Sequence, residues 1–301
     1  MADRRLYAAE AVSASDPLTG VRVRQVTNHP SIHHQPFYYL PAYDDAMRYL
    51  FFVSHRTGRP EIFAELRAGG GHGPHEGCLL QLTEHQGLSE WSVHPSHDGR
   101  YVYFTDHRGG WRVDVETLKS EQLVDFGDMA SREPGMVGAA MGTTSLSRDD
   151  HFWAVPVNLG KVTQLLVIDT DTGTCRFIHE APSIGHPQFH PDDPSWLRYA
   201  GPYTHRIHVL RRDGSGHRLA FDRDAGAKQW IVHETWRPGT MEILTADWPN
   251  GVLGIDVVSG RVRRVCSFNA WHPMIDRTGR RMVTDTVFPD SGYAHVCEVG
   301  V

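Results

Sequence analysis

The chain has 301 residues, of which 40% are hydrophobic and 22% charged, so it can bury a large core. Its formal net charge is −6 with histidine counted as neutral, which excludes a general nucleic-acid binder. No apolar run is long enough to span a bilayer, and residues 1–20 lack the apolar stretch of a signal peptide. The four cysteines form no CxxC pair, so we expect free thiols in a reducing, cytoplasmic setting.

One pattern of strands recurs along the chain with a period of roughly 40 to 50 residues. Each copy has an apolar strand, a polar turn, and then two strands rich in aromatic and β-branched residues. The copies cover residues 38–66, 89–117, 143–173, 185–214, 232–260 and 271–300, with turns at Asp45, Gly99, Asp150, Asp193, Gly239 and Gly279. This spacing is typical of four-stranded propeller blades. We therefore predict an all-β fold, a single six-bladed β-propeller over residues 1–301, with residues 1–19 flexible or peripheral.

Fourth strands follow four of the copies, at residues 78–84, 120–126, 175–181 and 261–268. The last copy stops after its third strand. We expect the segment Gly20–Thr27, GVRVRQVT, to supply the missing strand and close the ring, which would remove two exposed sheet edges. A seventh blade in the weakly patterned stretch from Asp125 to Gly142 is the alternative.

Three histidines occupy the same position in consecutive copies, at the start of the first strand. They are His186 in HPQFHP, His233 in HETWRP and His272 in HPMIDR; the earlier copies have Leu40, Glu90 and Thr143 at this position. Such positions lie at the mouth of a propeller's channel, so we expect the three side chains to converge there. The alternative is a structural histidine that bonds backbone at each blade start.

A second group of histidines follows the proposed closing strand, in RQVTNHPSIHHQPFYY. Gln25, His29, His33 and His34 are its candidate ligands. If the N-terminal strand completes the last blade, this segment follows directly beside His272. Nitrogen and oxygen donors of this kind suit a divalent metal ion. The alternative is a solvated polar loop.

Arg206 lies in the copy between His186 and His233. A fixed guanidinium near the channel mouth is suited to a substrate carboxylate, although it is equally well explained as a surface arginine. We expect His186, Tyr203, His205 and Trp236 to contact substrate in the same pocket. For Trp236, packing in the core is an equal alternative.

At these residues the sequence resembles the oligogalacturonate lyases, a polysaccharide lyase family with a propeller fold. The resemblance runs from about residue 20 to residue 293 and is carried by LFFVSHRTGRPEIF, GHPQFHPDDP, AGP, VHETWRPG and WHPMIDRTG. The family has a GHP blade, a GP turn with a downstream arginine, a CTHEFW-like blade and a SHLMS-like blade in the same order.

The resemblance implies roles for three residues. His233 matches the catalytic base, Arg206 the arginine that assists it, and His272 a metal ligand. The family's other ligands lie in a Q-V-T-H-P-H run near the C-terminus, which this chain lacks. Its nearest match is RQVTNHPSIHH, which implies Gln25 and His29 as ligands, with His33 or His34 as the third. The chain also has Arg198-Tyr199-Ala200 where the family tends to have C-H-E, so its sugar specificity stays open.

The implied activity is metal-assisted β-elimination on a small acidic oligosaccharide, a 4-linked uronate oligomer such as those from pectin. Manganese is the expected metal; zinc, nickel and iron remain alternatives. We expect no nucleic-acid or membrane partner, and the sequence does not indicate an oligomeric state. Two other functions stay open: a non-catalytic binding platform of the TolB kind, and a metal-dependent sugar epimerase or isomerase.

Overall fold

A computed structural model describes residues 5–127, 142–223, 229–286 and 296–301. Strands dominate this part of the chain, and its helices are two short 3-10 turns, η1 (Gly73–His75) and η2 (Glu90–Ser92). None of the described helices has the length and apolar character needed to cross a membrane. The chain forms two compact units, Met1–Arg132 and Glu133–Val301.

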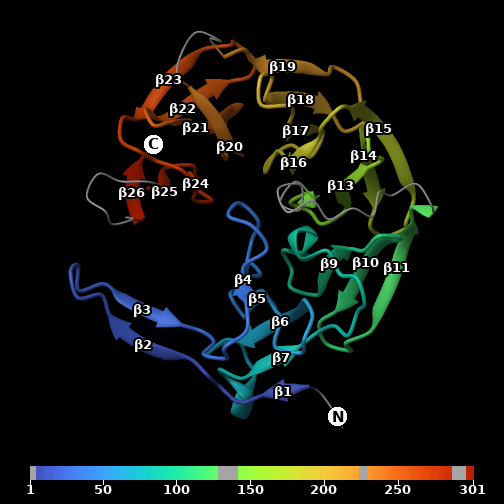
Figure 1. The fold of residues 1–301 in the computed structure, drawn as a ribbon, viewed down its shortest axis with the longest axis vertical. Coiled ribbons are helices and arrows are strands. Elements are labelled where there is room, and N and C mark those ends of the chain that lie inside the picture. Colours follow the sequence, from blue (N-terminus) through green and yellow to red (C-terminus); the bar gives the residue numbers. More distant parts are fainter. Residues whose placement is uncertain (1–4, 128–141, 224–228, 287–295) are drawn as a thin grey trace. The chain divides into compact units, whose positions relative to one another are not determined.

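Six antiparallel sheets are the blades of a six-blade β-propeller, which confirms the predicted fold class (Figure 1). The first unit contains two blades and the second contains four. The stretch that was the candidate for a seventh blade falls mostly on residues 128–141, which lie outside the described residues.

The first unit has a five-stranded and a four-stranded blade. In the first blade the order is β4, β5, β6, β7, β1: His33–His34, Tyr49–Ser54, Glu61–Leu66, Leu79–Gln81 and Leu6–Tyr7. In the second blade the order is β8, β9, β10, β11: His94–Pro95, Tyr101–Thr105, Gly109–Asp114 and Ser120–Asp125. Part of the segment expected to be peripheral, Leu6–Tyr7, is therefore the outermost strand of the first blade.

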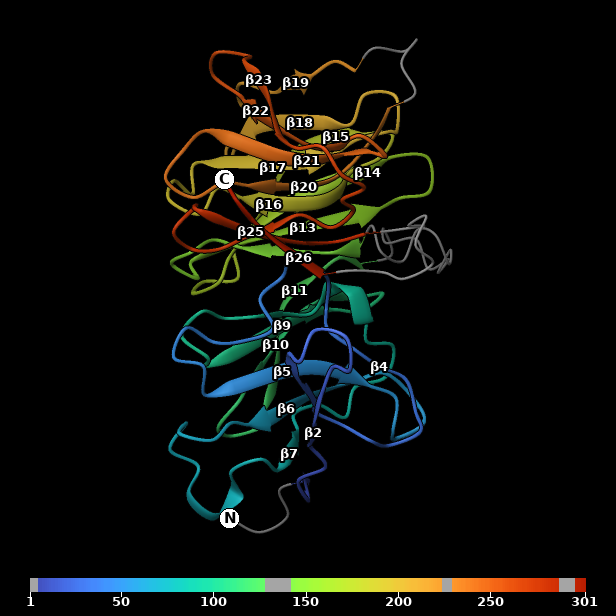
Figure 2. The same ribbon diagram turned by 90° about the vertical axis from the view of Figure 1, so that its left-hand side faces the viewer.

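Among the described residues, the second unit has three four-stranded blades and one of three strands. Many of its strands can be followed from the side in Figure 2. The third blade has β12 to β15: Ser145–Leu146, Phe152–Asn158, Thr163–Asp169 and Cys175–Ala181. The fourth has β16 to β19: Gly185–Phe189, Trp196–Ala200, Ile207–Arg211 and Arg218–Phe221. The fifth has β20 to β23: Trp230–Trp236, Glu242–Trp248, Gly251–Asp256 and Val262–Cys266. The sixth has β24 to β26: Met274–Ile275, Arg281–Asp285 and Val296–Gly300.

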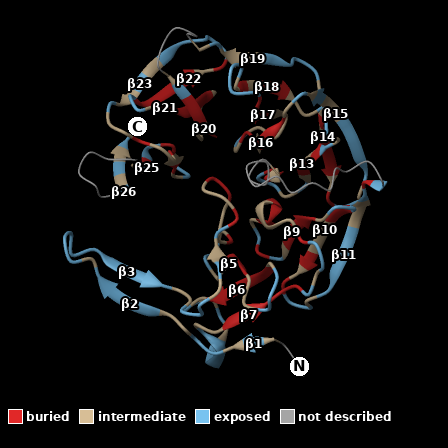
Figure 3. Ribbon diagram, viewed as in Figure 1, coloured by how far each residue is buried: buried red, intermediate tan, exposed pale blue. Residues whose placement is uncertain are grey.

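The core lies between consecutive blades. One apolar cluster joins the first and second blades, and others join the third to the fourth, the fourth to the fifth and the fifth to the sixth. Outer strands such as β11, β15 and β23 are mostly exposed, whereas middle strands such as β6, β14 and β21 are buried (Figure 3). Because the middle strands are buried against neighbouring blades within each unit, they are rich in apolar residues.

The turns between first and second strands have the conformation that their residues favour. Gly99, Gly239 and Gly279 have φ angles of +71°, +75° and +67°, and Asp150 has +61°. Glycine adopts this left-handed region without steric cost, and Asp tolerates it better than most residues. The repeated turns identified in the sequence are therefore turns in the structure.

The strand expected to close the ring has a partner close to it in the sequence. The strand β3 (Arg22–Gln25) pairs with β2 (Val12–Ser15) in a separate two-stranded hairpin, and the described part of the last blade has three strands. Asp16 closes the hairpin, because its Oδ1 accepts hydrogen bonds from the backbone N–H of Leu18 and Thr19 at 3.1 and 2.7 Å. A short local loop costs less entropy than pairing with the far end of the chain, and the sequence reasoning overlooked Val12–Ser15 as a partner.

The first blade also departs from the predicted register. Its first strand is β4, upstream of Leu40, and residues 38–40 form a turn. Pro36 and Pro41 bracket this turn, and proline lacks the backbone N–H that a strand ladder requires. His33 and His34 therefore belong to a blade strand instead of a connecting loop.

Candidate functional site

Two of the three repeated histidines lie at β-bulges in the first strands of neighbouring blades. His186 in β16 has φ +50° and His233 in β20 has φ +57°. The pairing register shifts between Gly185 and Gln188, and again between Val232 and Thr235. Bulges redirect side chains, and a left-handed histidine is strained, which is a feature found often at functional sites.

The ring of His233 is held in one tautomer. Its Nδ1 lies 2.8 Å from the carbonyl oxygen of Trp271. A carbonyl only accepts hydrogen bonds, so Nδ1 carries the proton and Nε2 carries the lone pair. The rings of Trp271 and His272 lie beside it, with centroids at 4.5 and 4.3 Å.

His272 is oriented by a carboxylate. Its Nδ1 lies 2.8 Å from Oδ2 of Asp285, and its backbone N–H donates to Oδ1 of the same residue at 2.9 Å. A neutral His272 therefore carries its proton on Nδ1 and a lone pair on Nε2. Such a carboxylate–histidine pair suits either a metal ligand or a proton-transfer residue.

Arg206 is fixed by a buried ion-pair network. Its Nε donates to Oε1 of Glu234 at 2.8 Å, and Nη1 of Arg198 lies 3.4 Å from Oε2 of the same carboxylate. Arg198 also donates to the backbone carbonyl oxygens of Glu234 and His186. Two guanidinium groups share one carboxylate, so the network keeps a net positive charge that favours an anionic ligand.

Burial and charge keep the two bulge histidines neutral. Burial, the neighbouring His272 ring and the positive charges of Arg206 and Arg198 together lower the pKa of His233 to about 3, against the opposing hydrogen bond to Trp271. Burial also lowers the pKa of His186 to about 3, and Arg206 contributes in the same direction. Both imidazoles are therefore unprotonated near neutral pH.

The residues predicted to contact substrate lie in different environments. His186 is buried, with Nδ1 3.2 Å from Oγ1 of Thr143. His205 is exposed, and Tyr203 lines a pocket described below. Trp236 is only 2% exposed and packs in the core between the fourth and fifth blades, so its predicted contact with substrate is wrong. A large apolar side chain at the end of a mostly buried strand, β20, favours the core.

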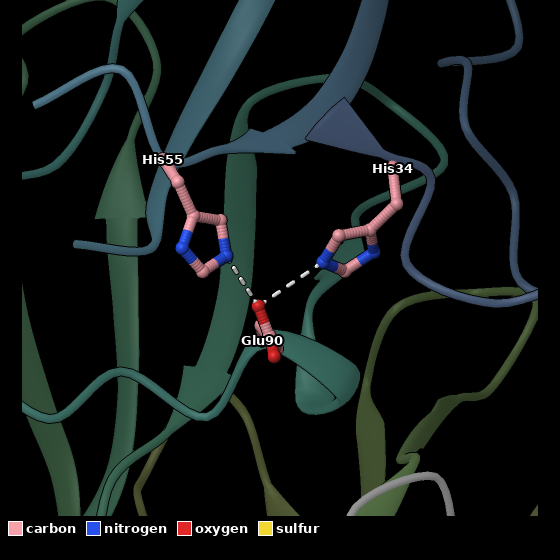
Figure 4. A group of neighbouring side chains, drawn as sticks. All are labelled: His34, His55 and Glu90. Carbon is pink, nitrogen blue, oxygen red and sulfur yellow. Dashed lines mark hydrogen bonds and ion pairs between the residues drawn. The ribbon is translucent and has the colours of Figure 1, made fainter. Parts of the chain in front are cut away.

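A group of metal-donor side chains lies in the first unit (Figure 4). Oε2 of Glu90 is 2.7 Å from Nε2 of His55 and 3.2 Å from Nε2 of His34. All three donor atoms lie within 4.8 Å of one another, and it is the one such group found among the described residues. The ring of His34 stacks on Trp91 with centroids 4.7 Å apart, which holds it in place.

The hydrogen bonds of the His34 ring are consistent with a cation bound at this group. Nδ1 of His34 lies 2.7 Å from the carbonyl oxygen of Gln35, so this nitrogen carries the proton. In a neutral ring Nε2 then directs its lone pair at the carboxylate of Glu90, which is unfavourable unless a proton or a metal ion lies between them. Two imidazoles and one carboxylate form a donor set suited to divalent transition metals.

The other predicted ligands have local hydrogen bonds. Nε2 of Gln25 donates to the carbonyl oxygen of Thr27 at 2.7 Å, and Nδ1 of His29 accepts from Ser31. Nε2 of His33 lies 3.1 Å from the carbonyl oxygen of His29. None of the three belongs to the donor group of His34. A metal site shared by His272 and the 25–34 segment stays a prediction.

The sequence reasoning missed several residues of these two sites. His55 and Glu90 were not considered as ligands, although Glu90 stands at the repeated position where later copies have histidine. Asp285 and Glu234 were not identified as partners of His272 and Arg206. The sequence does contain a signal for Arg198. It is the one charged residue in an otherwise apolar strand, WLRYA, and a buried charge needs a partner.

No protein-family model matches this chain, and no curated protein matches its sequence. Solved structures do match it. Oligogalacturonate lyase from Vibrio parahaemolyticus has a TM-score of 0.81 at 18% identity, covering 99% of this chain and 84% of that chain. A structure of oligogalacturonate lyase in complex with manganese has a TM-score of 0.80 at 19% identity, covering 98% and 85%.

A more distant likeness is to TolB from Acinetobacter baumannii. Its TM-score is 0.52 at 13% identity, and the match covers 97% of this chain and 60% of that chain. At such low identities these likenesses show a shared propeller fold. The lyase structures resemble this chain over nearly its whole length, as the sequence motifs had predicted.

Proposed function

We propose that this protein is a lyase that cleaves 4-linked uronate oligomers by metal-assisted β-elimination, in the cytoplasm. The observation that carries the proposal is His233, a neutral histidine held in one tautomer beside a fixed arginine. The likeness of the fold to oligogalacturonate lyases supports the same reaction class. The substrate expected from that likeness is an oligogalacturonate.

In this reaction His233 acts as the base. Its Nε2 lone pair takes the C5 proton of the uronate, which lies α to the carboxylate. The electrons of that C–H bond form the double bond between C4 and C5, the bond from C4 to its glycosidic oxygen breaks, and this oxygen takes up a proton. A pKa near 3 makes the free imidazole a weak base. A bound carboxylate raises this pKa, because it offsets the positive field of Arg206 and Arg198.

Arg206 stabilises the developing negative charge. The C5 proton is weakly acidic, so charge on the uronate carboxylate must be neutralised as the enolate character grows. Glu234 holds the Nε edge of the guanidinium and leaves the outer nitrogens to face a ligand. The arginine is thus oriented before substrate arrives, and little reorganisation is needed at the transition state.

A divalent ion supplies Lewis-acid polarisation of the uronate carboxylate when bound. Within the first unit, the side chains of His34, His55 and Glu90 fit a divalent ion by donor type and spacing. The competing assignment is the sequence-based set, His272 with Gln25, His29 and either His33 or His34. Manganese is the metal we propose, in line with the ion named for the similar lyase structure.

The activity is tested with purified protein, galacturonate oligomers and added manganese. The new double bond of the product absorbs in the ultraviolet, so its formation is followed directly. We expect product only when metal is present, with loss on chelation and recovery on readdition. Bound metal without unsaturated product from any uronate oligomer would instead favour an epimerase or isomerase, and would overturn the lyase proposal.

The two metal assignments are separated by measuring bound manganese, without reference to activity. We expect His55→Gln to lower manganese affinity by about 10- to 100-fold, because one of three donors is lost. His272→Gln should then leave the affinity unchanged. His151→Gln, at an exposed histidine of the second unit, is the matched control. The opposite pattern, loss with His272→Gln and none with His55→Gln, contradicts the assignment to His34, His55 and Glu90.

A further inference from the structure

An aromatic pocket lies in the second unit at one end of the fifth blade. Its volume is about 490 Å³, within the range of small-molecule sites. The residues that line it are Tyr203, Arg223, Gln229, Trp230, Trp248, Pro249 and Asn250. Tyr203 and Trp230 are 46% and 40% exposed, so their rings offer apolar faces to a ligand. Large exposed aromatic side chains gathered at one place mark binding surfaces.

One side chain, Trp271, connects the aromatic pocket to the proposed catalytic base. Trp230 and Trp248 face each other in the β20–β21 ladder. The ring of Trp271 lies edge-on to both, with centroids at 5.2 and 6.1 Å, and it also lies edge-on to the ring of His233 at 4.5 Å. A ligand that reacts at His233 can therefore extend past Trp271 into the pocket.

Arg223 supplies a fixed positive charge to the pocket. Its guanidinium lies over the ring of Tyr203, 4.2 Å from the centroid, and Nη1 donates to the carbonyl oxygen of Gln229 at 2.7 Å. The hydroxyl of Tyr203 donates to the same carbonyl at 3.1 Å. Both side chains are thus anchored at one point. The remaining N–H groups of Arg223 are suited to a carboxylate, for which arginine offers a two-pronged donor.

We propose that this aromatic pocket binds a second uronate residue of the oligosaccharide, the one next to the residue that reacts at His233. The sugar ring lies against Tyr203 and Trp230, and its carboxylate pairs with Arg223. This proposal rests on the proposed function for the identity of the ligand. It explains why an aromatic surface and an arginine stand together beside the catalytic base, and it makes the enzyme selective for oligomers that are charged along their length.

The first test measures binding without turnover. Calorimetry with the His233→Gln variant determines Kd for galacturonate oligomers of two, three and four residues. Adding Arg223→Gln should weaken binding of the oligomers that reach the pocket by about 10- to 100-fold, the loss typical of a hydrogen-bonded ion pair. Arg223→Lys, which keeps the charge and loses the planar fork, should show a smaller loss. Arg261→Gln changes an exposed arginine of the same unit and serves as the matched control.

The second test changes the ligand and leaves the pocket intact. Reducing the carboxyl group of the second residue to an alcohol should weaken binding to the protein with Arg223 by a similar factor. The same reduction should have little effect when Arg223→Gln is already present, because the two changes remove one interaction. This comparison also holds if Arg223→Gln folds poorly, since the reduced oligomer can be compared with the unreduced one on protein that keeps Arg223.

The outcomes separate this proposal from the proposed function. Equal Kd values with and without Arg223→Gln at every length, together with indifference to the reduced carboxyl, overturn the pocket assignment even if unsaturated product forms. Binding that depends on Arg223, with no product from any oligomer, supports the pocket and overturns the lyase. If no oligomer binds at all, both are wrong.

Discussion

The first strands of the fourth and fifth blades contain the same kind of β-bulge, but the residues around the bulged histidine differ. His186 and His233 both lie in a bulge with a left-handed φ angle, in β16 and β20. His186 is 7% exposed, and Thr143 lies at its Nδ1. His233 is only half-buried, its Nδ1 is held by a carbonyl, and His272 lies beside its ring.

The difference shows that the repeat places a histidine at this position, whereas contacts from the neighbouring blade determine whether it can act as a base. Both histidines are neutral for the same reason, burial beside arginine. Only His233 combines this with a fixed tautomer and a second histidine that is itself held by Asp285. The same bulge therefore supports a structural histidine in one blade and a candidate base in the next.

The largest expected effect is the loss of activity when His233 is replaced, and it tests the difference between the two histidines directly. His233→Gln should lower kcat for uronate oligomers by about 10²- to 10⁴-fold, the contribution typical of a general base. His186→Gln should lower it far less, because Thr143 and the fourth blade enclose that ring. Product absorbance gives the rates, and His151→Gln controls for loss of a histidine as such. Equal losses for the two bulge variants would refute the distinction between them.

The next effect concerns the buried carboxylate of Glu234, which follows His233 in the bulge of β20. Glu234→Gln leaves Arg198 and Arg206 without their buried counter-charge, so the free energy of unfolding should fall by about 3–5 kcal/mol. Urea unfolding followed by circular dichroism measures this change. Glu298→Gln breaks an exposed pair with Arg281 and should cost at most about 1 kcal/mol. A loss for Glu234→Gln as small as that of the control would show that the network carries no buried charge.

The smallest effect is a dependence of stability on pH. His186 has a folded pKa of about 3 against 6.5 in the unfolded chain, so the unfolded state binds more protons below pH 6.5. Stability is therefore lost as the pH falls from 6.5 toward 3, by about 2 kcal/mol at pH 5 from this residue alone.

His186→Gln should flatten that slope, as measured by unfolding at pH 7 and pH 5. His151→Gln, at an exposed site, should leave the slope as it is. A slope that is unchanged in His186→Gln would mean that this imidazole is already accessible to protons in the folded state.

Local signals in the sequence predicted most of the fold. The strands and turns of the blades follow from alternating apolar residues and from turn residues such as Gly99 and Asp150, which act over a few positions. The hairpin of β2 and β3 was missed, because VSAS has weak strand character and pairs through a turn closed by Asp16. Its short loop favours this local pairing.

The candidate sites were predicted only where the repeat itself brings residues together. His233 and His272 share a register position, and the structure brings their rings into contact. His34, His55 and Glu90 come from two blades with no common spacing, so packing between blades alone assembles them. Glu234 follows His233 in the sequence, but its role depends on Arg198 in the neighbouring blade, which only the folded chain reveals.

The cluster of Trp230, Trp248 and Trp271 has an optical consequence. Indole rings in edge-on contact at 5.2 to 6.1 Å interact strongly enough to couple their electronic transitions, and one of them touches the candidate base. Tryptophan emission and near-ultraviolet circular dichroism should therefore respond when a sugar covers Trp230. The protein thus contains its own spectroscopic reporter of occupancy, which needs no label and no turnover.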